Sequence, residues 1–421
     1  MNFLRLTLIP ILAGLCAFPT AADTFKAGTA NRVITPDPLL PVSGGVGVPK
    51  AVHEKKGELW ARVLVLENKD TRVAFLSIDT LGWPRIWGDK IRDRVKAIAP
   101  ENILIGATHT HSAPDAYDFP DEKGEHHADL NYLEWVCDEA AAAIDEAAAN
   151  TVPASLKIAV GEAQGKIAYN YYAPKLYDPR CAVLQAVTED GTVLATLVNY
   201  AIHPEVLGSN KGILSPDLCG PLYDRIASQG GGLALFFNSA QGGMVTADNR
   251  GEDGDLETWE ECVRIGELLA DEALRIVADA PVQEDPVLVC AAAAVHLTVT
   301  SPLMQMILDN SSIATDMKDK NILVTQVNLV TVGSAKILTI PGEALPNIGY
   351  YLKRNMNTAQ PFLFGLTNDA FGYMLSKYDF NSFKRYEYIS ETSLGEMAAE
   401  EYIEQALRLI ENVSHSETVA E

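Results

Sequence analysis

The sequence predicts an α/β fold in which a mixed β-sheet core is flanked by helices within a single large catalytic domain. Apolar, β-branched runs alternate with segments of helical spacing along the chain, an order typical of α/β proteins. Apolar residues make up 48% of the 421 residues and charged residues 21%, a composition typical of globular chains. No internal repeat and no long Pro/Ser-rich linker divides the sequence, so a single domain is the simpler prediction.

Strands are expected where apolar and β-branched residues run together, and helices where apolar residues recur every three to four positions. The turn dipeptide Asp190-Gly191 indicates a hairpin between two of the strands. In chain order, the expected elements are strands at 59–67 and 73–79, a helix at 86–98, a strand at 103–111, a helix at 132–150, hairpin strands at 182–187 and 193–201, a strand at 232–237, a helix at 256–278, strands at 287–299, 322–332, 336–340 and 362–366, and a final helix at 393–412.

The N-terminus has the organisation of a secretory signal peptide. Arg5 provides a positive charge, residues 6–18 form an apolar stretch, and Thr20-Ala21-Ala22 is a small-residue cleavage site. We therefore expect a signal peptide at 1–22, a catalytic domain at 23–412 and a polar tail at 413–421. The mature chain should have no transmembrane segment and should be exported to the periplasm or the extracellular space.

Charge and motif content narrow the range of partners. The formal net charge of −23 argues against nucleic acid and against adsorption to anionic lipid, and leaves apolar or neutral substrates open. The sequence has no GxSxG, Walker or GxGxxG motif, which disfavours serine hydrolases and nucleotide-binding proteins. The five cysteines that follow the signal peptide match no disulfide framework and no CxxC zinc site, so at most one or two bridges are expected.

Two histidines at the end of an apolar run are the strongest chemical signal. The segment ILIGATHTHSAP brings His109 and His111 to the end of a predicted strand. Side chains two positions apart on an extended backbone point the same way, so the two imidazoles are expected to converge. Neutral imidazole is the commonest protein ligand for zinc and a frequent general base. The pair therefore predicts half of a metal site.

Residues that could bind a ligand also follow other predicted strands. LATLVNYAIHP leads to His203, KILTIPGE to Glu343, and FLFGLTNDAFGY to Asn368, Asp369 and Tyr373; LALFFNSAQGG leads to Asn238 and Ser239. Ligands bind at the carboxyl ends of strands in α/β sheets, because the loops converge there. Two His and one Glu leave zinc an open position, which is typical of a catalytic site. Such zinc lowers the pKa of water to about 7 and polarises a carbonyl, the chemistry of amide or ester hydrolysis.

Each of these residues also has a structural interpretation. A single histidine at a strand end can be a hydrogen-bonded core residue, Glu343 can cap a helix that starts near Leu345, and Tyr373 can belong to the core. Their joint occurrence at successive strand ends favours the metal site. The acidic, histidine-containing segment 118–129 is predicted to be a solvated loop, with a role at the substrate mouth as the alternative.

Nine segments resemble, in order, those of the neutral, non-lysosomal ceramidase family, whose members are zinc-dependent enzymes that cleave the N-acyl bond of ceramide. They are VITPDP, LWARVLVLE, FLSID, THTHSAP, VNYAIHP, LSPDLCGPL, IPGEALPNIG, GLTNDAFGY and RYEYISETSLG, and the resemblance runs from about Lys26 to Asn412. It implies one zinc ion per chain and an N-acyl lipid substrate. Ceramidases carry an additional C-terminal β-sandwich domain, which we expect to be absent from this chain.

The resemblance also assigns site residues. It implies metal ligation by His109, His203, Glu343 and Tyr373, and catalytic roles for His111, Tyr386 and Thr246. His111 and Tyr386 would assist proton transfer or oxyanion stabilisation, and Thr246 would contact the reacting group. Asp217, in SPD, matches an acidic position that could orient a ligand histidine.

Three positions depart from the family pattern. In GGMVTADN, Thr246 replaces a serine credited with a catalytic role and Met244 replaces an aspartate. Tyr171 stands where the family has an arginine facing the site, and Arg180 is the candidate substitute. These changes leave the predicted metal site intact, but they weaken the prediction that ceramide itself is the substrate.

The sequence thus predicts an exported zinc-dependent amidohydrolase that cleaves the N-acyl bond of ceramide or of a related N-acyl lipid or amine with zinc-activated water. One alternative is a zinc esterase or amidase acting on a small non-lipid substrate. The other is a secreted binding protein of the same fold that has lost catalysis, an interpretation motivated by the replaced positions. Nothing in the sequence indicates the oligomeric state.

Overall fold

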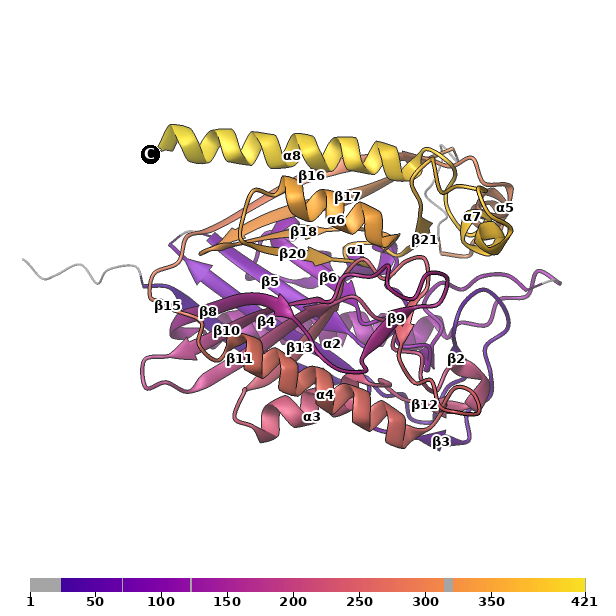
Figure 1. Ribbon diagram of the computed structural model, residues 1–421, viewed down its shortest axis with the longest axis horizontal. Coiled ribbons are helices and arrows are strands. Elements are labelled where there is room, and N and C mark those ends of the chain that lie inside the picture. Colours follow the sequence, from indigo (N-terminus) through magenta and orange to yellow (C-terminus); the bar gives the residue numbers. More distant parts are fainter. Residues whose placement is uncertain (1–23, 70, 122, 314–320, 421) are drawn as a thin grey trace, which may run out of the picture.

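Two β-sheets stacked face to face, with helices on both outer sides, make up the protein (Figure 1). The computed structural model describes residues 24–69, 71–121, 123–313 and 321–420. The predicted signal peptide at 1–22 lies outside the described residues. Within the described part, no helix is both long and apolar enough to cross a membrane.

The larger sheet has nine strands. Their order is β13-β11-β10-β8-β1-β4-β5-β6, with β15 beside β8, and neighbours are antiparallel except for the pairs β11–β13 and β5–β6. The strands are β1 (Lys26–Val33), β4 (Trp60–Asn68), β5 (Thr71–Ile78), β6 (Ile103–Ala107), β8 (Val152–Glu162), β10 (Arg180–Thr188), β11 (Val193–Tyr200), β13 (Leu233–Asn238) and β15 (Val282–Gln283).

The smaller sheet has four strands in the order β16-β17-β18-β20, namely β16 (Leu288–Thr298), β17 (Ile322–Val332), β18 (Ala335–Thr339) and β20 (Gln360–Phe364). β18 and β20 are parallel. Its inner face packs on the larger sheet through a largely apolar core in which Phe237 stacks on Phe364 at 4.2 Å between ring centroids. Burial of each such ring stabilises the fold by about 1.5–3 kcal/mol.

Helices cover the outer faces. The larger sheet is covered by α1 (Arg85–Arg94), α2 (Leu130–Ala149), α3 (Cys219–Ser228) and α4 (Trp259–Val277), and the smaller by α6 (Pro346–Asn355) and α8 (Ala398–Ala420) (Figure 1). The side chains of Asp129 and Thr258 accept backbone N–H bonds at the first turns of α2 and α4, so each helix begins directly after a capping residue.

Short elements build the connections. They are α5 (Pro302–Asn310), α7 (Glu387–Glu391), the 3₁₀ turns η1 (Pro100–Asn102), η2 (Ser209–Lys211) and η3 (Lys384–Tyr386), and the strands β2 (Val42–Ser43), β3 (Glu54–Lys55), β7 (Ala113–Pro114), β9 (Ala168–Asn170), β12 (Ile213–Leu214), β14 (Val245–Ala247), β19 (Gly342–Ala344) and β21 (Phe371–Met374).

The predicted fold class is confirmed, and the structure corrects several elements. The strand expected at 103–111 ends at Ala107, and α8 continues through Ala420, past the boundary at 412 predicted for the tail. Strand β8 and helix α3 were not predicted because Pro, Ala, Ser and Lys weaken the strand signal of VPASLKIAVGE, and Gly and Pro weaken the helix signal of CGPLYDRIAS. The five cysteines among the described residues are all unbridged: Cys137, Cys181, Cys219, Cys262 and Cys290.

Candidate metal centre

The loops that follow β6, β11 and β18 bring three predicted ligands together. His109 follows β6, His203 follows β11, and Glu343 lies in β19 directly after β18. The ligating nitrogens of His109, His111 and His203 all lie within 4.8 Å of one another. Glu343 Oε2 lies 3.1 Å from His203 Nε2 and 3.5 Å from His109 Nε2. The convergence at strand ends that the sequence predicts is therefore present.

The backbone conformation that brings the two histidines of the THTHS segment together differs from the one predicted. The expectation of an extended backbone through both is wrong, because His109 has a left-handed φ of 75°. Its backbone N–H donates to the Thr80 carbonyl at 2.9 Å, and the N–H of His111 donates to Pro204 at 3.1 Å. This turn still places the Nε2 atoms of His109 and His111 at 3.3 Å from each other.

Backbone carbonyls orient two of the imidazoles. His109 Nδ1 lies 2.6 Å from the Leu81 carbonyl, and His203 Nδ1 lies 2.8 Å from the Val245 carbonyl. A carbonyl oxygen only accepts, so each Nδ1 carries the proton and donates it. In its neutral form, each ring then has a lone pair on Nε2, on the side that faces the other ring and Glu343. This is the tautomer that a metal-binding histidine needs.

The charges of this buried group depend strongly on one another. His203 is 1% and His109 3% exposed. Burial raises the pKa of the Glu343 carboxyl, but the imidazoles of His109 and His203 outweigh it and hold that pKa well below its usual range. Burial lowers the pKa of His203, while the carboxylates of Glu205 and Glu343 raise it to about 9. Burial and the two neighbouring imidazoles lower the pKa of His111 well below the ordinary value.

The donor set fits a divalent cation. With both Nδ1 protons donated to carbonyls, the two Nε2 lone pairs and the Glu343 oxygen all face one point as acceptors. Acceptors packed together away from water repel each other unless a proton or a metal ion lies between them. Imidazole nitrogen and carboxylate oxygen are preferred zinc ligands, and three such ligands leave a coordination position open.

Tyr373 lies beside Glu343 on the neighbouring strand. β21 pairs in parallel with β19, and Glu343 is opposite Tyr373 in the register. The Tyr373 hydroxyl donates to Met244 Sδ at 3.3 Å. Burial, followed by the Glu343 charge, raises the pKa of Tyr373 well above its ordinary value, so the side chain is a neutral phenol. The structure thus places the fourth predicted ligand next to the third.

Thr246 contacts a carboxylate that the sequence reasoning missed. Thr246 lies in β14, which forms a bridge to His203, and its hydroxyl donates to Glu205 Oε1 at 2.5 Å. Glu205 Oε2 in turn lies 3.6 Å from His111 Nδ1. Glu205 lies two places after His203 in AIHPE, where no distinctive sequence pattern marks it.

Tyr386 packs against apolar and aromatic residues near Tyr373. Its ring packs against Tyr172 and Phe383, at 5.3 and 5.4 Å between centroids, and contacts the same small apolar cluster as Tyr373 and Met244. The structure therefore brings His109, His111, His203 and Glu343 together directly, whereas Tyr386 is connected to this group only through the apolar cluster that contains Tyr373.

Comparison with known proteins yields a match in three-dimensional structure. No family model and no curated protein sequence matches the chain. The crystal structure of neutral ceramidase from Pseudomonas aeruginosa superposes with a TM-score of 0.73 at 16% identity, covering 92% of this chain and 74% of the ceramidase. A ceramidase complexed with C2 gives the same TM-score and identity, with 93% and 76% coverage. The chain has the neutral ceramidase fold.

Within this ceramidase fold, Asn238 at the end of β13 holds both histidine-bearing loops. Its Nδ2 donates to the Thr108 carbonyl at 3.2 Å and to the Ile202 carbonyl at 2.7 Å. These are the residues immediately before His109 and His203. Its Oδ1 accepts the N–H groups of Ile202 and Ser239. Asn238 is fully buried, and the sequence placed it at the sheet edge without assigning it this role.

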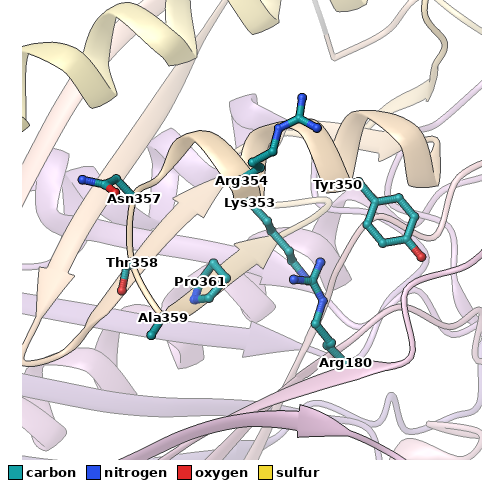
Figure 2. A pocket seen from close by; sticks show the side chains of 8 residues that line it. All are labelled: Arg180, Tyr350, Lys353, Arg354, Asn357, Thr358, Ala359 and Pro361. Atoms are coloured by element: carbon teal, nitrogen blue, oxygen red, sulfur yellow. The ribbon is translucent and has the colours of Figure 1, made fainter.

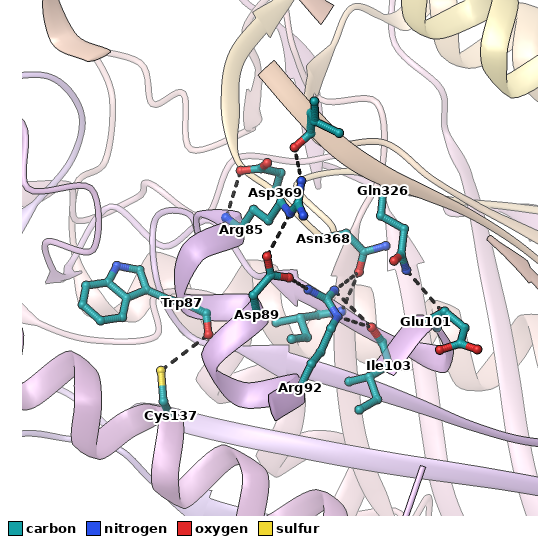
Figure 3. A network of polar contacts seen from close by, with 12 residues as sticks. Arg85, Trp87, Asp89, Arg92, Glu101, Ile103, Cys137, Gln326, Asn368 and Asp369 are labelled. Atoms are coloured by element: carbon teal, nitrogen blue, oxygen red, sulfur yellow. Dashed lines mark hydrogen bonds and ion pairs between the residues drawn. The ribbon is translucent and has the colours of Figure 1, made fainter. Parts of the chain in front are cut away.

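A second buried asparagine fixes the loop between β20 and β21. Asn368 accepts from Arg92 Nη2 at 2.8 Å (Figure 3). It also donates to Asn328 Oδ1 at 2.8 Å and has a left-handed φ of 70°. Next to it, Asp369 accepts the backbone N–H of Arg85 at 3.0 Å. These bonds hold helix α1 and this loop together and fix the start of β21, the strand that carries Tyr373.

Two residues singled out by the family resemblance have structural partners instead. Asp217 accepts the backbone N–H groups of Leu207 and Leu218, so it holds the loop after His203 and does not orient an imidazole. Arg180 forms a two-pronged ion pair with Asp178, both distances being 2.8 Å. Asp178 also binds the buried Lys353 at 2.9 Å.

Arg180 and Lys353 line a surface groove of about 680 Å³ (Figure 2). The groove lies between α6 and the loop before β20, and its lining includes none of the residues of the histidine group. Arg180 is paired with Asp178 and lines this groove, away from the histidine group, so it does not replace the family arginine. Tyr171, at that position, is 64% exposed.

The acidic, histidine-containing loop forms its own small cluster. Asp121, Glu125 and His127 bring their ligand atoms within 4.8 Å of one another, with His127 Nε2 3.1 Å from Asp121 Oδ2. Asp121 already accepts the backbone N–H groups of Lys123 and Glu125. These partners satisfy the loop internally, consistent with the predicted solvated loop.

Proposed function

We propose that this protein is a zinc-dependent amidohydrolase that cleaves the N-acyl bond of ceramide or of a related N-acyl lipid or amine. The observation that carries the proposal is the meeting of His109, His203 and Glu343, with both imidazoles oriented by backbone carbonyls, at a strand-end site of a neutral ceramidase fold. The two structural neighbours are themselves described as ceramidases.

His109, His203 and Glu343 would hold one zinc ion per chain, with the Tyr373 oxygen as the fourth protein ligand. When bound, zinc lowers the pKa of water to about 7 and polarises the substrate carbonyl. The buried setting excludes competing water, which strengthens every electrostatic interaction with the substrate.

His111 is the proposed proton-transfer residue. Its Nδ1 faces the Glu205 carboxylate, and its Nε2 faces the ligand group at 3.3 Å from His109 Nε2. A carboxylate on one side of an imidazole stabilises the protonated ring. His111 would accept a proton from the attacking water at Nε2 and deliver it to the departing nitrogen, which leaves as the amine while the acyl group becomes the acid.

Tyr386 and Thr246 are proposed to act on the substrate. Tyr386 would donate a hydrogen bond to the carbonyl oxygen as negative charge develops there. Thr246 would contact the reacting group with its hydroxyl oriented by Glu205. Export, as the N-terminal signal predicts, would give the enzyme access to lipid outside the cytoplasm.

The test is hydrolysis of N-dodecanoylsphingosine, followed as release of dodecanoic acid by mass spectrometry. The wild type should release it, and His203→Ala should be slower by at least about 1,000-fold, because loss of several kcal/mol of metal-supplied stabilisation corresponds to that factor. His296→Ala is the matched control, since His296 is exposed on β16 and outside the site.

Two outcomes would replace the proposal. Turnover of short acyl esters or small amides without turnover of the long-chain amide would favour a zinc esterase or amidase for non-lipid substrates. Absence of hydrolysis across amides and esters, with less than one zinc per chain, would favour a binding protein that keeps the fold.

A further inference from the structure

Glu205 is a second carboxylate in the candidate site, separate from the proposed metal ligands. Its Oε1 accepts the Thr246 hydroxyl at 2.5 Å, which fixes the orientation of the carboxylate. Its Oε2 lies 3.6 Å from His111 Nδ1, beyond hydrogen-bonding distance. The side chain is 23% exposed, whereas Glu343 is 10% exposed. Glu205 therefore presents a fixed carboxylate with free acceptor capacity to whatever enters the site.

No lysine or arginine side chain is bonded to Glu205 or to the other site residues in the described part of the chain. In the described part of the chain, the hydrogen bonds and ion pairs of the site residues involve no lysine or arginine; these residues are His109, His111, His203, Glu205, Thr246, Glu343 and Tyr373. Arg180 is bound to Asp178, and position 171 is a tyrosine. A substrate carboxylate next to Glu205 would be repelled by it and would find no lysine or arginine there to bind.

We propose that Glu205 is the specificity-determining residue for the amine half of the substrate. It would favour amine halves that carry an ammonium or a hydroxyl group, as a hydrogen-bond donor, next to the scissile nitrogen. It would reject amine halves that carry a carboxylate. The inference rests on the proposed amide hydrolysis at this site. A carboxylate accepts strongly from ammonium and more weakly from hydroxyl groups, and it repels another carboxylate. The site would thus select N-acyl amino alcohols and diamines over N-acyl amino acids.

Four dodecanoyl amides that differ only in the amine half test this selectivity: the 2-aminoethyl, 2-hydroxyethyl, ethyl and carboxymethyl amides. For the wild type, kcat/KM should decrease in that order, with the carboxymethyl amide at least tenfold below the ethyl amide. Each value is expressed relative to the ethyl amide of the same variant, so that a general loss of activity cancels.

Glu205→Gln removes the charge but keeps the shape. In this variant, the relative kcat/KM of the 2-aminoethyl amide should fall at least tenfold, and that of the carboxymethyl amide should rise at least tenfold. A purely structural role of Glu205 would lower all four together and leave the ratios unchanged. Glu189→Gln is the matched control, because Glu189 is an exposed glutamate in the β10–β11 turn, at the opposite end of β11 from His203.

Equilibrium binding provides a readout that does not depend on turnover. Calorimetric titration of the metal-free full-length chain with the 2-aminoethyl and carboxymethyl amides should show at least tenfold tighter binding of the former, and Glu205→Gln should reduce this ratio to near one. Ratios that Glu205→Gln leaves unchanged would overturn the inference. Absence of hydrolysis with the binding ratio intact would contradict the proposed function alone.

Discussion

Replacement of Asn238 by alanine tests whether this residue positions the loops that carry His109 and His203. The substitution removes two hydrogen bonds donated to Thr108 and Ile202 and two accepted from Ile202 and Ser239, all of them buried. At about 1 kcal/mol for each bond, the free energy of unfolding should fall by about 4 kcal/mol. In a chain of 421 residues this corresponds to a Tm lower by about 5 °C.

The loss should also affect metal binding. Asn238 holds the carbonyls immediately before His109 and His203, so its removal frees both loops and should weaken zinc binding about tenfold, at the lower end of the range for residues that support metal ligands. Differential scanning calorimetry gives the Tm, and competition with a chromophoric chelator gives the zinc affinity.

Asn199→Ala is the matched control. Asn199 is equally buried and also makes four hydrogen bonds, to the carbonyls of Phe237, Asn238 and Leu363 and from the N–H of Leu363. It should cost similar stability and weaken zinc binding much less. Equal losses of zinc affinity in the two variants would refute the assignment of Asn238 as a positioning residue.

Three further substitutions test other parts of the structure. Gly242→Ala would place Cβ 2.0 Å from the Glu343 carbonyl oxygen, so the zinc affinity measured by calorimetry should weaken at least about tenfold. Gly161→Ala is the control, because its Cβ meets only the flexible Ile276 side chain at 3.1 Å; its zinc affinity should stay near that of the wild type. Asn368→Ala should be less stable in denaturant unfolding than Asn368→Gly by about 1 kcal/mol, because alanine resists the positive φ; the opposite order would contradict the strain argument. Lys353→Met should lower the free energy of unfolding by about 2–3 kcal/mol at pH 7, because the buried Asp178 carboxylate loses one of its two cationic partners. The loss is smaller than for a carboxylate left with no partner, since Arg180 still binds Asp178. Burial raises the pKa of Asp178, but Lys353 and Arg180 lower it to about 2, below its ordinary value of 3.8. The pair therefore stabilises the protein above about pH 4, and the effect of Lys353→Met should shrink as the pH falls from 4 towards 2; an effect that grows in acid would contradict it.

The sequence predicts the fold class and most of the long strands and helices because local patterns determine them. Apolar runs define β4, β5, β11 and β13, and the acidic, alanine-rich periodicity defines α2. Strand β8 forms without such a pattern, since β1 and β10 on either side supply its hydrogen bonds. The division of the strands into two stacked sheets depends on tertiary packing that periodicity does not encode.

The same distinction holds for the site. His109, His203 and Glu343 were predictable because each follows an apolar strand. The left-handed turn at His109 was not, because it depends on the Thr80 and Leu81 carbonyls from another strand end. Glu205 was missed since a glutamate after His-Pro has no distinctive pattern, and only folding brings it to Thr246.

The most direct test of the central claim is the zinc content of the purified full-length protein, measured by elemental analysis after dialysis, in the wild type and in His203→Ala. The account predicts about one zinc per wild-type chain and strong depletion in the variant, because His203 is one of the four proposed protein ligands of the ion. Equal zinc content in both proteins, or none in a folded wild type supplied with zinc, would contradict it.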